Sequence, residues 1–133
     1  MSHNKVVLLL GSNLGDRNKN LSDAQKLINT EIGEITSMSE IIESVAEDYE
    51  SQNNFLNATL KINTKLTPIV LVKKVKEIEQ IIGRIYTDNQ QRYQDRLIDI
   101  DILFFNNIKY ESKKLNIPHP QIYYRNFIKK ILN

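Results

Sequence analysis

The stretch LIDIDILFF at residues 97–105 predicts a β-strand, because apolar and acidic side chains alternate along its first half. Side chains on a strand point alternately to the two faces of a sheet, so Asp99, Asp101 and Leu103 are expected on one face. The isoleucines that alternate with the acids indicate a strand in the middle of a sheet. The sequence therefore predicts a buried strand with two carboxylates on one side.

The segments before and after this strand predict the rest of an α+β fold. Apolar spacing and turn residues predict strands at 5–11, 34–44 and 54–65, and helices at 20–32 and 67–83. The second and third of these strands are expected to pair with each other. Asn106-Asn107 predicts a turn, followed by a short return strand at 108–110. The order of elements is that of a ferredoxin-like βαββαβ sandwich with a mostly antiparallel sheet.

Length and composition predict one domain over residues 1–133. Apolar residues make up 41% of the chain, and no apolar run approaches the roughly 20 residues of a membrane span. The first residues lack the features of a secretory signal. The chain has no cysteine, which excludes disulfides and thiolate chemistry. We therefore expect a cytoplasmic protein without membrane contact.

The charge pattern allows two interpretations. The net charge is only +2, which argues against a general binder of polyanions such as nucleic acid. Residues 31–50 carry seven acidic and no basic side chains, whereas residues 109–130 carry six basic and one acidic. These are either solvated surfaces, or the basic half faces a compact anionic ligand.

Asp99 and Asp101 are the first candidates for chemistry. Two residues apart on a strand, they lie roughly 6.5–7 Å apart at the Cα atoms. Their charges repel unless a cation lies between them, and Mg²⁺ held by carboxylates and substrate phosphates is a common arrangement. The alternative is an exposed strand face with two solvated acids.

A long polar segment between the second helix and this strand adds positive charge. Arg84, Arg92 and Arg96 lie in it or beside it, and guanidinium groups bind phosphate oxygens in pairs. Together with the two aspartates they predict a phosphoryl-transfer site. His119, fixed between two prolines, either hydrogen-bonds a phosphate or is structural. The segment GSNLGD at 11–16 lacks the Lys-Ser/Thr of a P-loop, so a structural turn is expected there.

Several short pieces occur together in a characteristic order. They are GSNLGD at 11–16, FLNA at 55–58, Gly83-Arg84, RLIDIDIL at 96–103 and PHP at 118–120. The set resembles the 6-hydroxymethyl-7,8-dihydropterin pyrophosphokinase family over about residues 6–127. The resemblance implies a ferredoxin-like α+β fold and transfer of pyrophosphate from ATP to the hydroxymethyl group of the pterin, releasing AMP. It also implies two Mg²⁺ ions held by Asp99 and Asp101.

The resemblance assigns three groups of residues. Those expected to act in the transfer are Arg84, Arg96, Asp99 and Asp101. Those expected to bind ATP are Glu79, Arg84, Arg92, Arg96, Ile102, Lys114, Asn116, His119 and Arg125. Those expected to bind the pterin are Ser44, Val45, Phe55, Asn57, Tyr93 and Phe127. Phe55 and Phe127 would stack on the ring, and Asn57 would hydrogen-bond its edge.

The chain also departs from the family pattern. The loop after Arg84 is about two residues longer than usual, and Tyr86 stands nearest to a further family arginine. The segment after Ser44 lacks the usual prolines, and Pro120 takes the place of an aromatic residue. The chain stops just after Leu132, where other members continue, so we expect either a minimal version or a truncated one.

Three other functions fit parts of the pattern. A ferredoxin-like RNA-binding module would stack bases on sheet aromatics, but the acid pair would repel its phosphates. A conventional kinase would release ADP instead of AMP, and an impaired family member would bind its ligands without turnover. We expect ATP and a hydroxymethyl dihydropterin as partners, no nucleic acid, and a monomer or weak homodimer.

Overall fold

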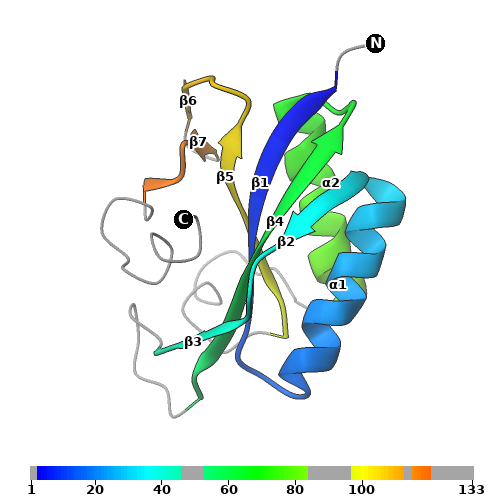
Figure 1. Ribbon diagram of the computed structural model, residues 1–133, viewed down its shortest axis with the longest axis vertical. Coiled ribbons are helices and arrows are strands. Elements are labelled where there is room, and N and C mark those ends of the chain that lie inside the picture. Colours follow the sequence, from blue (N-terminus) through cyan, green and yellow to red (C-terminus); the bar gives the residue numbers. More distant parts are fainter. Residues whose placement is uncertain (1–2, 46–52, 84–96, 113–114, 121–133) are drawn as a thin grey trace.

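The computed structural model describes residues 3–45, 53–83, 97–112 and 115–120. Two helices and seven strands occur in these ranges (Figure 1). In chain order they are β1 (Asn4–Ser12), α1 (Arg17–Glu31), β2 (Gly33–Met38), β3 (Ile42–Ser44), β4 (Phe55–Thr64), α2 (Pro68–Ile82), β5 (Asp99–Phe105), β6 (Tyr110–Glu111) and β7 (Asn116–Ile117).

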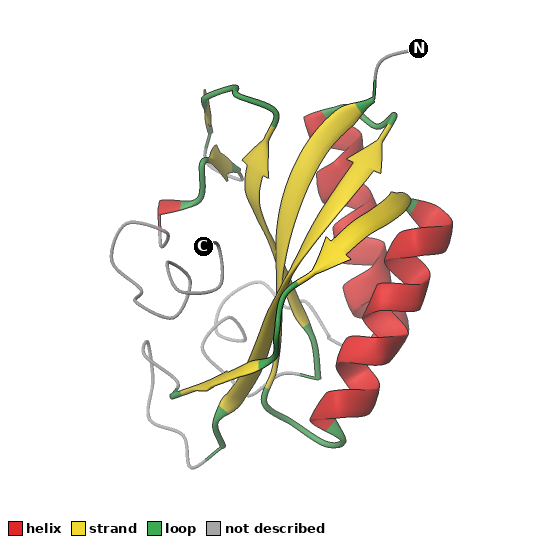
Figure 2. Ribbon diagram, viewed as in Figure 1, coloured by secondary structure: helices red, strands yellow, loops and turns green. Residues whose placement is uncertain are grey.

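The main sheet has the strand order β2-β4-β1-β5, with β3 also paired to β4. Every strand pairing in the described ranges is antiparallel. This confirms an α+β fold with an antiparallel sheet. It also confirms the predicted pairing of residues 34–44 with 54–65, since β2 and β3 both pair with β4. Both helices lie on the same face of the sheet, so the molecule has two layers (Figures 1 and 2).

The hydrophobic core lies between the sheet and the helices. Alternate residues of β1 supply its centre, namely Val6, Leu8 and Leu10, each at most 1% exposed. The helices contribute Leu21, Ala24 and Ile28 from α1, and Leu71, Val75 and Ile78 from α2. Neither α1 nor α2 lies on the opposite side of the sheet (Figure 2). Neither described helix is both long and apolar enough to cross a membrane.

The helix ends follow local capping. α1 begins at Arg17, three residues before the predicted start, because the Asp16 side chain accepts a hydrogen bond from Lys19 N (3.1 Å). α2 begins as predicted, with Thr67 as N-cap and Pro68 in the first turn. Gly83, at φ +129°, ends it by donating its N–H to Glu79 O.

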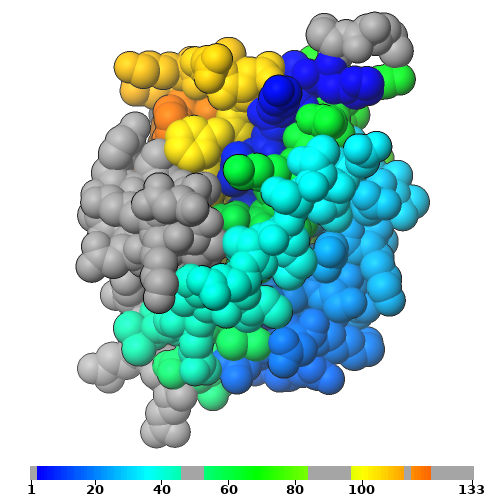
Figure 3. All heavy atoms as spheres, in the orientation of Figure 1, coloured from blue at the N-terminus to red at the C-terminus, as the bar shows by residue number. Residues whose placement is uncertain are grey.

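The predicted strand at 34–44 is broken into β2 and β3. At the break, Ser39 N donates to Thr59 O (3.0 Å), while Ser39 Oγ accepts from Thr59 N (2.8 Å). A side-chain oxygen thus replaces a backbone carbonyl, and the ladder continues without regular strand geometry. In the space-filling view this segment (cyan) runs over the visible face beside α1 (blue) (Figure 3).

Two predictions about the last strands were wrong. β5 is the terminal strand of the described sheet rather than a central one, and its apolar residues are buried by helix packing on one face. The expected return strand is at Tyr110–Glu111 and pairs with β7, not with β5. A register shift opposite Leu103 explains why Ile102 and Phe105 both reach the core, because a bulge residue changes the alternation.

Candidate functional site

Asp99 and Asp101 lie on the side of the sheet opposite the helices. Between and after them, Ile100 and Ile102 are each 5% exposed and belong to the core. The acids therefore point the other way, as the period-two pattern predicted. Across the ladder Asp99 pairs with Gly11, and Asp101 pairs with Leu9. The structure thus brings both carboxylates to the face opposite the helices, on the terminal strand of the described sheet.

His119 approaches the acidic pair from the segment after β7. Its backbone N–H donates to Leu103 O (3.0 Å), which holds this segment against β5. Its Nε2 lies 3.8 Å from Oδ1 of Asp101, and both side chains are partly exposed, at 25% and 30%. A predicted ATP-binding residue and a predicted metal ligand therefore stand side by side.

The donor chemistry of this face suits Mg²⁺. Asp99 and Asp101 offer hard carboxylate oxygens, which Mg²⁺ prefers, and both are reachable from solvent. Among the residues that the structure describes, no group of three or more His, Asp and Glu side chains is arranged to hold a metal ion. Asp99 and Asp101 are therefore the candidate ligands on this face among the described residues.

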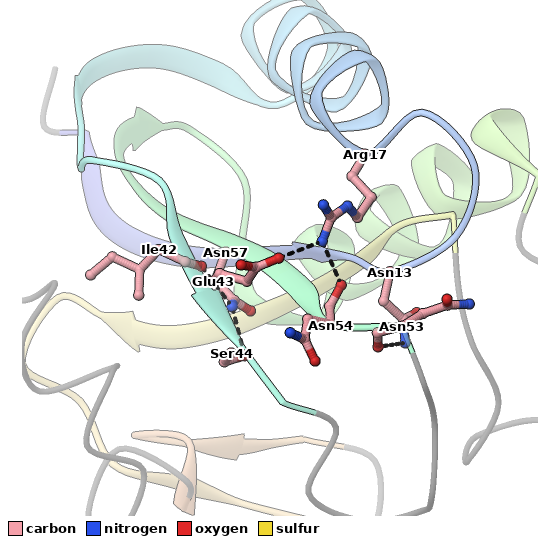
Figure 4. Close-up of polar contacts among 8 residues, drawn as sticks. All are labelled: Asn13, Arg17, Ile42, Glu43, Ser44, Asn53, Asn54 and Asn57. Carbon is pink, nitrogen blue, oxygen red and sulfur yellow. Dashed lines mark hydrogen bonds and ion pairs between the residues drawn. The ribbon is translucent and has the colours of Figure 1, made fainter.

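A second group of predicted residues meets at the other side of Gly11. On β4, Asn57 pairs with Gly11, so Asn57, Gly11 and Asp99 form one row across three strands. Asn57 Nδ2 donates to Ile42 O (3.0 Å) and to Ser44 Oγ (2.8 Å) (Figure 4). The amide is therefore fixed by β3.

Gly11 lacks a side chain that would crowd this row. A Cβ atom placed there would stand 3.3 Å from both Asn57 Oδ1 and Phe55 Cδ1. The Phe55 ring and the Asn57 side-chain oxygen therefore lie close to Gly11. We call Ser44, Phe55 and Asn57 the pterin wall, after their predicted role. A ligand held by this wall would lie over Gly11, with Asp99 next along the row.

Glu79, a predicted nucleotide contact, lies in the interior of the protein. It is 2% exposed, and its Oε2 accepts a hydrogen bond from Ile100 N (2.8 Å) between α2 and β5. Its position four residues after Val75 and three before Ile82 places it on the buried stripe of the helix, and this spacing could have revealed its burial. Its contact with a nucleotide stays a prediction.

The remaining predicted residues fall into two groups. The side chain of Ile102 is in the core, Asn116 is exposed on β7, and Val45 is 62% exposed just after β3. Other predicted residues lie outside the described ranges: Arg84, Arg92, Tyr93, Arg96, Lys114, Arg125 and Phe127.

The segment GSNLGD forms a turn, as expected, but it also makes contacts that the sequence did not reveal. Asn20 Nδ2 donates to Leu14 O (2.9 Å) and to Ser12 Oγ (3.2 Å), which fastens the turn to α1. Directly after it, Arg17 reaches the neighbourhood of the pterin wall (Figure 4).

A pair of carboxylates and an aromatic–amide wall share the sheet face opposite the helices, where Phe55 and Asn57 are buried and the carboxylates are partly exposed. The chain belongs to the 7,8-dihydro-6-hydroxymethylpterin-pyrophosphokinase (HPPK) family, whose model matches residues 7–133.

Individual relatives support this membership. The chain is 38% identical over 129 residues to the 2-amino-4-hydroxy-6-hydroxymethyldihydropteridine pyrophosphokinase of Porphyromonas gingivalis, covering 96% of this chain and 88% of that protein. It is 36% identical over 127 residues to the enzyme of the same name from Bacillus subtilis, covering 95% and 74%. The folate synthesis bifunctional protein of Pisum sativum is 40% identical over 124 residues, which are 93% of this chain and 24% of that protein.

Solved structures support the fold. A crystal structure of an HPPK-DHPS protein in complex with substrates matches with a TM-score of 0.74 at 20% identity. The wild-type Plasmodium falciparum HPPK-DHPS with pteroate matches with a TM-score of 0.75 at 19% identity. The alignments cover 98% and 99% of this chain, and 40% and 38% of those chains.

Proposed function

We propose that the chain transfers pyrophosphate from ATP to the hydroxymethyl group of 6-hydroxymethyl-7,8-dihydropterin, releasing AMP, on the sheet face opposite the helices. Family membership and the pyrophosphokinases of P. gingivalis and B. subtilis support this reaction, a step of folate synthesis. The observation that carries the site assignment is the row Asn57, Gly11 and Asp99 across three adjacent strands. This row would put the acceptor's ring and the transferring phosphates at neighbouring positions.

The two carboxylates would bind Mg²⁺, with two ions expected. When bound, Mg²⁺ would neutralise charge on the phosphates and make the attacking hydroxyl a better nucleophile. Asp99 and Asp101 need no movement of the strand for this, because their side chains already share one face. His119, beside Asp101, would donate a hydrogen bond from its imidazole to a phosphate oxygen.

The pterin wall would select a flat heterocycle. Asn57 Nδ2 is engaged by β3, while its Oδ1 faces the space over Gly11. This oxygen would accept a hydrogen bond from a ring N–H, so the wall favours a ligand with an amide-like donor edge. The Phe55 ring would cover one face of the heterocycle by offset stacking.

A pocket beside α2 would suit the nucleoside of ATP. It has a volume of about 410 Å³ and lies between α2 and the β6–β7 hairpin. Its lining residues are Ile69, Val72, Lys73, Lys76, Tyr110, Ser112 and Leu115. Aliphatic and aromatic walls suit a purine base, and the two lysines suit the phosphates that follow it. Asn116, a predicted ATP residue, directly follows Leu115.

The remaining predictions are part of the same proposal. When β2 and β3 are counted as one broken strand, the strand order supports the ferredoxin-like βαββαβ arrangement. We propose a single pyrophosphokinase domain over residues 1–133, located in the cytoplasm and monomeric or weakly dimeric, with no nucleic-acid partner.

Incubation with ATP, Mg²⁺ and the hydroxymethyl dihydropterin tests the reaction. AMP and the pterin pyrophosphate should form in equal amounts, and the reaction should stop when EDTA removes the metal. ADP as the product would instead identify a conventional kinase. Binding of both ligands without AMP formation would identify an impaired family member, and this result would contradict the proposal.

A further inference from the structure

Arg17, the first residue of α1, joins three separate parts of the chain. Its Nη1 donates to the backbone oxygen of Asn54 (2.8 Å) and lies 3.0 Å from Oε2 of Glu43 (Figure 4). One guanidinium nitrogen thus connects α1 with β3 and with the residue just before β4. The Arg17 side chain is only 34% exposed, so it lies against the protein surface rather than in solvent.

Both partners of Arg17 are immediate neighbours of the pterin wall. Glu43 precedes Ser44, and Asn54 precedes Phe55. Ser44 and Phe55 face each other in the β3–β4 ladder. Arg17 therefore contacts the residues that precede the Ser44–Phe55 pair, without itself belonging to the wall.

The wall needs such support because β3 is weakly held by its own backbone. It has three residues, and in the described ranges it pairs with β4 alone. The break around Ser39 separates it from β2. Asn57 anchors β3 from within the sheet through Ile42 O and Ser44 Oγ. Arg17 supplies a second anchor at the open end of the ladder.

The turn before α1 places Arg17 where it can contact Glu43 and Asn54. Gly15 adopts φ +69°, which favours glycine, and Asp16 then caps the helix. In the same turn, Asn13 Nδ2 donates to Asn53 O (3.3 Å). Asn13 and Arg17 thus donate hydrogen bonds to the carbonyl groups of Asn53 and Asn54, the two residues before Phe55. The turn therefore also fixes the start of β4.

We propose that Arg17 is a positioning residue for the pterin wall: it fixes Ser44 and Phe55 through Glu43 and Asn54 without touching either substrate. The inference rests on the proposed function, because it assumes that this wall binds the pterin. An exposed ion pair contributes little to overall stability. Its main effect is therefore on the geometry of the wall, where small displacements weaken binding.

The test compares Arg17→Met with a matched control. Methionine keeps the aliphatic stem and removes the charge and the donors. Lys19→Met is the control, since Lys19 lies on the same helix and pairs with Asp23 (3.2 Å), away from the wall. Arg17→Lys is a conservative variant, because its ammonium group keeps the positive charge and N–H donors. Pterin affinity, ATP affinity, melting temperature and amide exchange are measured for each protein.

Arg17→Met is expected to weaken pterin binding about three- to tenfold, the effect of a lost charge-assisted contact. ATP affinity should be unchanged, and Arg17→Lys should restore most of the pterin affinity. Amide exchange should rise at residues 42–44 and 54–57 in Arg17→Met only. Lys19→Met should match the wild type.

Two results would overturn the inference in an active enzyme: unchanged pterin affinity in Arg17→Met, or an equal loss of pterin and ATP affinity together with a lower melting temperature. The second would mean general loosening of the fold. If the wild-type protein itself binds no pterin, the proposed function fails, and the positioning role fails with it. Measuring the wild type first therefore separates the two failures.

Discussion

Glu79→Leu is expected to lower the free energy of unfolding by about 1–3 kcal/mol. Leucine has a similar size but cannot accept the hydrogen bond that Ile100 N now donates to Glu79 over 2.8 Å. Since Glu79 is 2% exposed, water cannot take the place of the carboxylate, and the N–H of β5 loses its acceptor. The gain from no longer burying a carboxylate offsets part of this cost, which is why we place 3 kcal/mol at the upper end.

Urea denaturation measures the difference, and Glu79→Gln is the matched control. Glutamine keeps an acceptor oxygen at the same distance along the side chain, so it should lose less stability than leucine does. A Glu79→Leu protein as stable as the wild type would refute the reasoning, and so would a glutamine variant less stable than the leucine one. ATP binding by Glu79→Gln adds a second readout: a large loss with intact stability would favour the predicted nucleotide contact over a role in the core.

Three further substitutions test other parts of the structure. Asp99→Asn should reduce Mg²⁺-dependent turnover at least about a hundredfold while changing unfolding free energy by less than about 1 kcal/mol; near-normal turnover would show that the metal assignment is wrong. Gly11→Ala should weaken pterin binding, because the added methyl group crowds the Phe55 ring at 3.3 Å. A pterin affinity equal to that of the wild type in a titration would contradict the proposed position of the ligand over Gly11. Gly33→Ala should cost about 3 kcal/mol of stability, because its Cβ would collide with the backbone oxygen of Asn63, which cannot move without disturbing β4. A melting temperature equal to that of the wild type would count against this packing.

Local patterns in the sequence predicted the elements that local chemistry determines. α2 was predicted at both ends because Thr67, Pro68 and Gly83 act within one turn of the helix. The orientation of Asp99 and Asp101 was predicted because strand alternation depends only on sequence spacing. The pairing of β2 and β3 with β4 followed from their order and short connections.

Contacts between distant residues were beyond the reach of such patterns. Arg17 meets Glu43 and Asn54 across 26 and 37 positions of sequence, and no periodicity links them. The break at Ser39 depends on its side-chain oxygen, which accepts the hydrogen bond from Thr59 N that a backbone carbonyl would accept in a regular strand. β5 was misjudged as central because an apolar strand can be buried by helices and loops as well as by strands on both sides.

The two-layer arrangement has a consequence for how the protein tolerates mutation. On β5, Ile100 and Ile102 pack under the helices, while Asp99 and Asp101 face the open side. Neighbouring codons in this stretch therefore affect different traits. A saturation scan that scored cellular abundance and turnover separately should give two interleaved sets of sensitive positions, one for each trait, alternating residue by residue.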